Sequence, residues 1–261
     1  MARLDSELVS RGLARSRERA KEMIRSGSVS VNGRTAKKPS DEVIAEDRIE
    51  SSETDIYVGR GALKLEKACE EFGLDLSGRV CLDIGASTGG FTDFMLQHGA
   101  QKVFAVDVGH DQLAESLRND SRVVNMEDTD IRNVTADDIG GQADFISVDV
   151  SFISLTKILP KVCELLKDGA VAAVLIKPQF EAGRSDIGKK GIVKDRKVHI
   201  RVLSEIDSFV NAVGLTAEGY TFSPVRGGSG NIEYLAKLRK AAGEPVIHDF
   251  RELVDSSFSK L

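Results

Sequence analysis

Four ionisable residues occur in segments that otherwise have the pattern of buried strands and helices: Lys64, Asp149, Lys177 and Glu233. Lys64 lies at the start of a helical segment, and Glu233 lies at the edge of a strand-like one. Asp149 and Lys177 each end an apolar, strand-like segment. Burying a charge without a partner is costly, so two lysines and two acids in such places are expected to neutralise one another. A lysine whose pKa is lowered can accept a proton, so such a cluster offers acid–base chemistry.

A glycine-rich turn follows the strand-like segment 80–84 and reads G-A-S-T-G-G-F over residues 85–91. Glycines let the backbone approach a ligand closely, and a turn that opens a helix presents N–H groups to it. Asp107 ends the next strand-like segment, where an acidic side chain can bind ribose hydroxyls. These features suit a nucleotide-containing cofactor, and both NAD and S-adenosylmethionine qualify.

Two details favour S-adenosylmethionine. Ser87 replaces the second glycine of the dinucleotide fingerprint. Asp83 stands just before the turn, where it can hold an ammonium group directly or through water, and NAD has no such group. Asp130 follows the third strand-like segment and can reach an adenine amino group. The predicted cofactor-binding residues are Asp83, Gly85, Ser87, Thr88, Gly89, Gly90, Phe91, Asp107 and Asp130.

The same turn also matches the G-x-S-x-G nucleophile elbow of serine hydrolases. In that alternative Ser87 is the nucleophile, Asp149 the acid, and His199 or His248 the base. The sequence lacks an oxyanion segment of the HGGG type, and His199 falls in a helical segment. We therefore rank the hydrolase below the methyl-donor interpretation.

The elements that must position these residues alternate along the chain, which indicates an α/β fold with a mostly parallel sheet. The last two predicted strands are joined by a loop without a helix, so they are expected to pair antiparallel. Seven strands that end in such a hairpin are typical of class I, Rossmann-like methyltransferases. Strands are predicted at 80–84, 103–107, 122–125, 145–149, 170–177, 216–222 and 232–237, and helices at 91–98, 112–117, 155–166 and 197–213.

The N-terminal segment is basic although the whole chain carries a net charge of -5. Residues 1–40 contain ten Lys or Arg and four Asp or Glu. Two short helices are expected here, the second capped by Ser16, followed by a strand and a hairpin turn at Asn32-Gly33. This arrangement resembles the alpha-L RNA-binding motif, a small α+β module that grips RNA through charge and shape. The resemblance implies RNA contacts by Arg3, Arg15, Arg17, Arg19, Lys21, Arg25 and Arg34.

Composition limits the remaining classes. The chain has 261 residues, of which 41% are hydrophobic and 30% charged, enough for one large core and a small module. Its longest apolar run, residues 170–176, is too short to span a membrane, and no secretory signal is evident. Three scattered cysteines predict neither a disulfide framework nor a metal site, and favour the cytoplasm. The expected domains are 1–56, 57–242 and a helical tail, 243–261.

The order Lys64, Asp149, Lys177, Glu233 resembles the tetrad of FtsJ-like ribose 2'-O-methyltransferases. Motifs at 57–65, 85–92, 106–113, 151–155, 177–181 and 230–234 extend this to the TlyA family, some of whose members are known as haemolysins. The resemblance implies methyl transfer from S-adenosylmethionine to the ribose 2'-oxygen of cytidine in ribosomal RNA or ribosomal subunits. It assigns Lys177 as the general base, oriented by Asp149 and Glu233, and gives Lys64 a role in positioning the substrate.

A basic, glycine-containing loop at 183–197 is a further candidate for RNA contact, through Lys189 and Lys190. Signatures for methylation of a base are missing: there is no N-P-P-Y or D-P-P-Y, and no cysteine lies in a suitable loop. A non-catalytic RNA-binding or assembly factor on the same fold remains an alternative. The sequence leaves the modified nucleotide, the ribosomal subunit and the oligomeric state undetermined.

Overall fold

The computed structural model describes residues 2–14, 16–51, 57–241 and 248–261. The chain divides into two compact units, Met1–Val58 and Gly59–Leu261, and each is described by itself. The expected contact of Arg15 with RNA falls outside the described residues, as do residues 243–247 of the expected tail. None of the helices within the described ranges has the length and apolar character needed to cross a bilayer.

The N-terminal unit packs two helices against short strands. Ser16 begins the second helix by accepting a hydrogen bond from the backbone N–H of Arg19, as a cap should. Asn32 and Gly33 both have positive φ, as a two-residue hairpin turn requires. Leu4, Leu8 and Met23 are fully buried in its core. The elements are β1 (Ala2–Arg3), α1 (Leu4–Ser10), α2 (Arg17–Arg25), β2 (Val29–Val31), β3 (Arg34–Thr35), β4 (Glu42–Val43) and β5 (Ile49–Ser51), with strand pairs β1–β4 and the order β3-β2-β5.

The large unit contains a seven-stranded sheet in the order β11-β12-β10-β9-β6-β7-β8. Strand β12 runs antiparallel to both of its neighbours, and the pairs from β10 to β8 are parallel. This topology confirms the expected class I fold with its terminal hairpin. The strands are β6 (Val80–Ile84), β7 (Lys102–Val106), β8 (Val123–Met126), β9 (Ala143–Val148), β10 (Leu166–Ile176), β11 (Thr216–Phe222) and β12 (Tyr234–Arg239).

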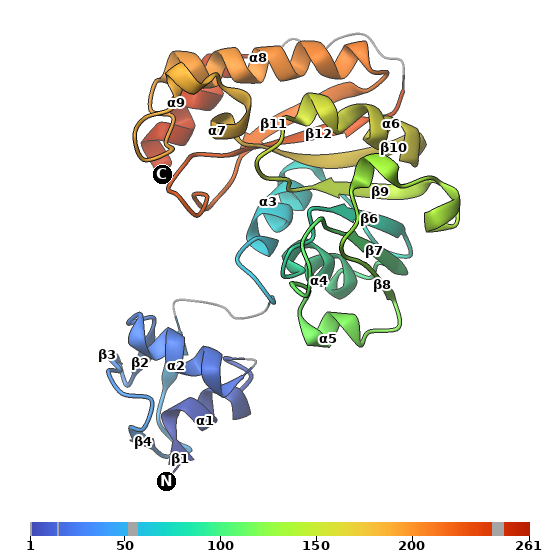
Figure 1. Ribbon diagram of the computed structural model, residues 1–261. Coiled ribbons are helices and arrows are strands. Elements are labelled where there is room, and N and C mark those ends of the chain that lie inside the picture. Colours follow the sequence, from blue (N-terminus) through green and yellow to red (C-terminus); the bar gives the residue numbers. More distant parts are fainter. Residues whose placement is uncertain (1, 15, 52–56, 242–247) are drawn as a thin grey trace. The chain divides into compact units, whose positions relative to one another are not determined.

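Helices cover both faces of this sheet (Figure 1). Helices α3 and α4 pack together on one face, and α8 packs against α9 and β11 on the other. The α-helices are α3 (Ala62–Phe72), α4 (Gly90–Gln97), α5 (Glu115–Arg118), α6 (Leu159–Leu165), α7 (Pro178–Glu181), α8 (Arg196–Ala212) and α9 (Phe250–Lys260). Short 3-10 turns occur at Ile131–Asn133, Asp137–Ile139, Leu155–Lys157 and Arg184–Asp186.

Several predicted boundaries are wrong for local reasons. The helix predicted at 155–166 is split into a 3-10 turn and α6, because Pro160 lacks an N–H and cannot continue a helix from the preceding turn. The helix predicted at 112–117 is reduced to α5, which begins at Glu115; the segment before it is tied to Glu127, whose side chain accepts from the backbone N–H groups of Gln112 and Leu113. The last strand begins at Tyr234, not at residue 232, so Glu233 lies just before it.

Candidate active site

The register of the sheet brings three members of the predicted tetrad together. Ile176, the last residue of β10, lies opposite Tyr234, the first residue of β12. Lys177 and Glu233 are therefore neighbours at the same edge. Strand β9 runs parallel to β10 on its other side, so Asp149, which follows β9, reaches that edge too. The first turn of α3, which packs against β12, adds Lys64.

The four side chains form a continuous chain of alternating charge. Lys177 Nζ lies 2.6 Å from Asp149 Oδ1. The other oxygen of Asp149, Oδ2, lies 3.5 Å from Lys64 Nζ, and Lys64 Nζ donates to Glu233 Oε2 at 2.8 Å. Glu233 is 2% exposed and the two lysines are under 10% exposed, so the charges are compensated within the cluster.

The two lysines of the tetrad, Lys64 and Lys177, have different charged partners. Burial lowers the pKa of Lys64, but the carboxylates of Asp149 and Glu233 outweigh it and raise that pKa above the usual lysine value. Lys64 is thus held as an ammonium ion and cannot accept a proton. Lys177 contacts one carboxylate, Asp149, and also donates to Ser151 Oγ at 2.8 Å. The two lysines therefore differ in their partners: Lys64 contacts two carboxylates, and Lys177 contacts one carboxylate and one hydroxyl group.

Two cavities meet at this edge of the sheet. One, of about 280 Å³, is lined by the glycine turn together with Asp149, Ser151 and Lys177. The other, of about 470 Å³, extends along the ends of β6 and β7 to Asp107 and Asp130. Gly85, Ser87, Asp149 and Ser151 line both. A molecule bound in the larger cavity can therefore present one end to Lys177.

Gly85 occupies the tightest point between the turn and the tetrad. Its φ is +84°, and a Cβ built on it would lie 2.5 Å from the carbonyl oxygen of Asp149. The backbone after β6 and the backbone after β9 approach each other here more closely than any side chain allows. Every residue predicted in the turn except Gly89 lines at least one of the two cavities. Gly89, with φ +94°, instead faces Leu113 and Leu117.

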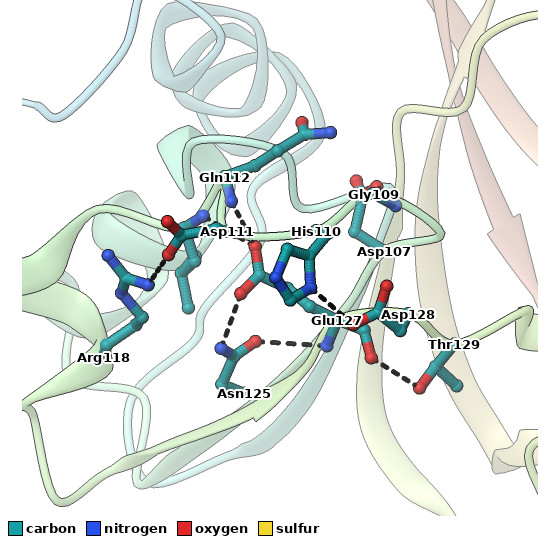
Figure 2. Close-up of polar contacts among 11 residues, drawn as sticks. Asp107, Gly109, His110, Asp111, Gln112, Arg118, Asn125, Glu127, Asp128 and Thr129 are labelled. Carbon is teal, nitrogen blue, oxygen red and sulfur yellow. Dashed lines mark hydrogen bonds and ion pairs between the residues drawn. The ribbon is translucent and has the colours of Figure 1, made fainter.

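Asp107 and the segment after β8 line the larger cavity. Figure 2 shows Asp107 beside the polar contacts of Glu127, Asp128 and Thr129. Asp107 Oδ2 accepts from the backbone N–H of Ser87 at 2.8 Å, and Oδ1 accepts from that of Gly109 at 2.7 Å. Asp130 lines the same cavity, but its carboxylate is paired with Arg132. Glu127 is not among the residues that line this cavity. Its carboxylate accepts hydrogen bonds from the backbone N–H groups of residues 112 and 113 and holds that segment in place.

Asp83 differs from the other predicted cofactor residues. It is wholly buried, and its carboxylate accepts hydrogen bonds from Thr92 Oγ1 at 2.7 Å and Ser147 Oγ at 2.9 Å. Burial, with hydroxyl groups rather than a cation as its partners, raises the pKa of Asp83 to about 6. Asp83 has no exposed surface and is not among the residues that line either cavity; its carboxylate ties the end of β6 to α4 and β9.

The geometry does not support the serine hydrolase. Ser87 Oγ donates to Gln112 Oε1 at 3.2 Å and not to a histidine. His199 is buried, with its ring nitrogens 2.9 Å from the Tyr234 hydroxyl and 3.0 Å from the Val193 carbonyl. His248 contacts the Ala217 carbonyl. Neither candidate base is placed to take a proton from Ser87.

Apart from Arg15, which lies outside the described residues, the predicted RNA-contacting residues of the N-terminal unit lie on its surface in exposed or half-buried positions. Arg3 and Arg17 pair with the buried Asp5, whereas Arg25 and Arg34 are exposed. On α2, Arg19 pairs with Glu22 and Lys21 with Glu18. In the large unit, Lys189 and Lys190 are exposed on the loop after α7.

Residue-type arguments missed three side chains at the site. Ser151 contacts Lys177, and Gln179 Nε2 lies 3.4 Å from Glu233 Oε1. Phe152 is 90% exposed, has a φ of +64°, and its ring centroid lies 4.9 Å from that of Phe180. A signal was present, since all three fall within the short motifs at 151–155 and 177–181 that carried the family resemblance.

A seven-stranded sheet with a reversed terminal hairpin, and a glycine turn at the ends of its parallel strands, define a class I methyltransferase that uses S-adenosylmethionine. The chain belongs to the FtsJ-like methyltransferase family, whose model matches residues 57–240, and a model of the S4 domain matches residues 2–49. Within that family it is a member of the TlyA group. The S4 match confirms the alpha-L module.

The sequences of individual relatives are similar to this chain along most of their length. "Putative rRNA methyltransferase YqxC" of Bacillus subtilis is 50% identical over 238 residues, 90% of this chain and 85% of that protein. "16S/23S rRNA (cytidine-2'-O)-methyltransferase TlyA" of Mycobacterium tuberculosis is 45% identical over 91% of this chain and 90% of that protein. A solved structure named "Putative hemolysin from Streptococcus thermophilus" is 42% identical, with a TM-score of 0.79 over 99% of this chain and 96% of that one.

Proposed function

We propose that this enzyme transfers a methyl group from S-adenosylmethionine to the ribose 2'-hydroxyl of cytidine in ribosomal RNA. The observation that carries the proposal is the chain from Lys177 to Glu233, which opens into a cavity shared with the glycine turn. The mycobacterial relative, named for this reaction, supports the choice of substrate. Because the proposed substrate is ribosomal RNA, we also propose that the enzyme acts in the cytoplasm.

The residues present fit the methyl donor. The larger cavity offers Asp107 for ribose hydroxyls, Asp130 for an adenine amino group, and the backbone of the 85–91 turn for the methionine end. Asp83 acts from within the core by holding α4 and β9 at the turn. S-adenosylmethionine supplies an activated methyl carbon on a sulfonium leaving group.

In the proposed reaction, the neutral amine of Lys177 removes the 2'-hydroxyl proton while the ribose oxygen forms a bond to the methyl carbon. S-adenosylmethionine, held by the residues that line the two cavities, would supply the methyl carbon, and its sulfur would keep the electron pair of the carbon–sulfur bond that is broken. Asp149 holds Lys177 at 2.6 Å and stabilises the positive charge that develops on it. Lys64, held as an ammonium ion by Asp149 and Glu233, keeps the other carboxylate oxygen of Asp149 in place. Positioned proton transfer of this kind is typically worth about 10² to 10⁴ in rate.

RNA contacts are proposed on both units. We propose that residues 1–56 grip RNA and that 57–242 carry the chemistry. The charges of Arg3, Arg17, Arg19, Lys21, Arg25 and Arg34 lie on the S4 domain, and those of Lys189 and Lys190 on the loop after α7. Arg15 has the same proposed role. Phe152, exposed at the rim of the larger cavity, is placed to stack on a base next to the reacting ribose.

The test is methyl transfer from labelled S-adenosylmethionine to ribosomal subunits, followed by mapping of 2'-O-methylcytidines. Lys177→Ala is expected to lower kcat by at least about 100-fold, because the proton acceptor is lost, while cofactor affinity measured by calorimetry stays within about twofold. The matched control is Lys157→Ala, which removes a lysine remote from the tetrad contacts.

Transfer by wild type to neither subunit would favour the assembly-factor alternative. Full activity of Lys177→Ala would remove the lysine base from the mechanism. Separate assays of the small and large subunits decide which of them is the substrate.

A further inference from the structure

Lys177 has two acceptors among the described side chains, and they come from the same short segment. Asp149 Oδ1 lies 2.6 Å and Ser151 Oγ 2.8 Å from Lys177 Nζ. Ser151 lies two residues beyond Asp149, after the end of β9. Its side chain is exposed and lines both cavities, where the donor and the ribose would meet.

The geometry of an amine gives this pair of contacts a consequence. A neutral lysine amine carries two N–H bonds and one lone pair, arranged tetrahedrally about nitrogen with the Cε bond. Each N–H donates to one acceptor, so contacts to both Asp149 and Ser151 use both donors. The lone pair must then occupy the one direction that remains. With Asp149 alone, the amine could rotate about its bond to Cε.

We propose that Ser151 is a positioning residue that directs the lone pair of Lys177 at the ribose hydroxyl. This inference rests on the proposed role of Lys177 as the base. The other groups near the amine do not replace Ser151. Lys64 lies on the opposite oxygen of Asp149, and Glu233 is paired with Lys64. The Phe180 ring, 5.8 Å from Nζ to its centroid, is beyond hydrogen-bond distance.

A purely structural role for Ser151 predicts that Ser151→Ala lowers Tm, whereas a positioning role predicts an unchanged Tm. The side chain of Ser151 is exposed and contributes no core packing, so we expect Ser151→Ala to fold with an unchanged Tm. Loss of alignment at the reacting atom lowers kcat and leaves the binding of both substrates alone, because alignment matters only in the transition state.

The experiment compares Ser151→Ala and Ser151→Thr in steady-state methyl transfer to ribosomal subunits. Ser151→Ala is expected to lower kcat about 10- to 100-fold with both KM values within about twofold of wild type. Ser151→Thr keeps the hydroxyl and is expected to recover most of kcat. The control is Ser154→Ala, which removes a hydroxyl of the same segment that donates to Glu181 at 2.6 Å; its kcat is expected to stay within about twofold.

Three outcomes overturn the inference. Wild-type kcat in Ser151→Ala, with Lys177→Ala inactive, removes Ser151 from positioning and leaves the proposed function standing. A raised KM for RNA with unchanged kcat makes Ser151 a binding residue instead. Full activity of Lys177→Ala removes the base itself, and then the proposed function fails as well.

Discussion

Among the described residues, each unit buries one aspartate completely, and the pKa values of the two shift in opposite directions. Asp5, in α1, accepts hydrogen bonds from the guanidinium groups of Arg3 and Arg17, which hold its pKa at about 2. Asp83, in β6, accepts from two hydroxyl groups, and burial raises its pKa to about 6. Two carboxylates without exposed surface therefore have opposite pKa shifts, because guanidinium donors lower the pKa of Asp5 while desolvation in the core raises that of Asp83, which has only hydroxyl donors.

Glu233 adds a third buried acid to the comparison of Asp5 with Asp83, and its partner is a lysine. Glu233→Gln leaves Lys64 with one carboxylate, Asp149, at 3.5 Å. We expect kcat to fall by about 100-fold or more, and the free energy of unfolding by about 3 kcal/mol, as when one partner of a buried pair is removed. Urea unfolding and methyl transfer measure the two effects. Glu22→Gln, in an exposed pair on α2, is the control and is expected to change both very little. Wild-type kcat in Glu233→Gln would show that Asp149 alone can organise Lys64.

Asp83→Asn tests the carboxylate that lacks a cation. Because the folded pKa of Asp83 lies above that of an unfolded aspartate, the stability it contributes is present below about pH 4 and is lost as pH rises through about 6. That difference in pKa corresponds to about 3 kcal/mol. Asparagine keeps the polar contacts without titrating. The variant is expected to match wild type near pH 4 and to exceed its Tm at pH 7 to 8.

Identical pH profiles of Tm for wild type and Asp83→Asn would contradict this assignment. Cofactor affinity of the variant adds a second distinction. A Kd for S-adenosylmethionine near that of wild type supports a role confined to the core, and a large increase supports a direct interaction with the ammonium group.

Asp5→Asn is expected to have the smallest effect and the opposite sign. The lowered pKa of Asp5 means that its contribution to stability is present above about pH 4 and is lost as pH falls toward 2. Arg3 and Arg17 are about half exposed, so solvent screening limits the loss at pH 7 to about 1 kcal/mol. Thermal unfolding of the S4-domain transition at pH 7 and pH 3 measures it. A larger loss at pH 3 than at pH 7 would contradict a stabilising carboxylate at Asp5.

The same comparison shows where sequence reasoning reaches its limit. The position of Asp83 before the glycine turn follows from the strand pattern, but its partners Thr92 and Ser147 come from α4 and β9, which only the packed sheet brings together. The fold class follows from alternating elements and the antiparallel hairpin, and both are confirmed.

The candidate site shows a similar division. The members of the tetrad could be named from the family motif. Ser151 and Gln179 also lie in the motifs, but their contacts with Lys177 and Glu233 could not be predicted, because these depend on the register between β9, β10 and β12. The shortened helix at α5 has a comparable cause. No local propensity encodes that Glu127 will bind the backbone of residues 112 and 113.

The contact between Gly85 and the Asp149 carbonyl has a consequence for redesign of the enzyme. A side chain at position 85 would push on the main chain of Asp149, so the proposed donor pocket cannot be altered there without disturbing the carboxylate that contacts Lys177. We expect that space for a bulkier sulfonium analogue must instead be made at other lining residues of the larger cavity, such as Val108 and Ile131. Engineered donor specificity in this scaffold is thus expected to come from the ends of β7 and β8, with the glycine left unchanged.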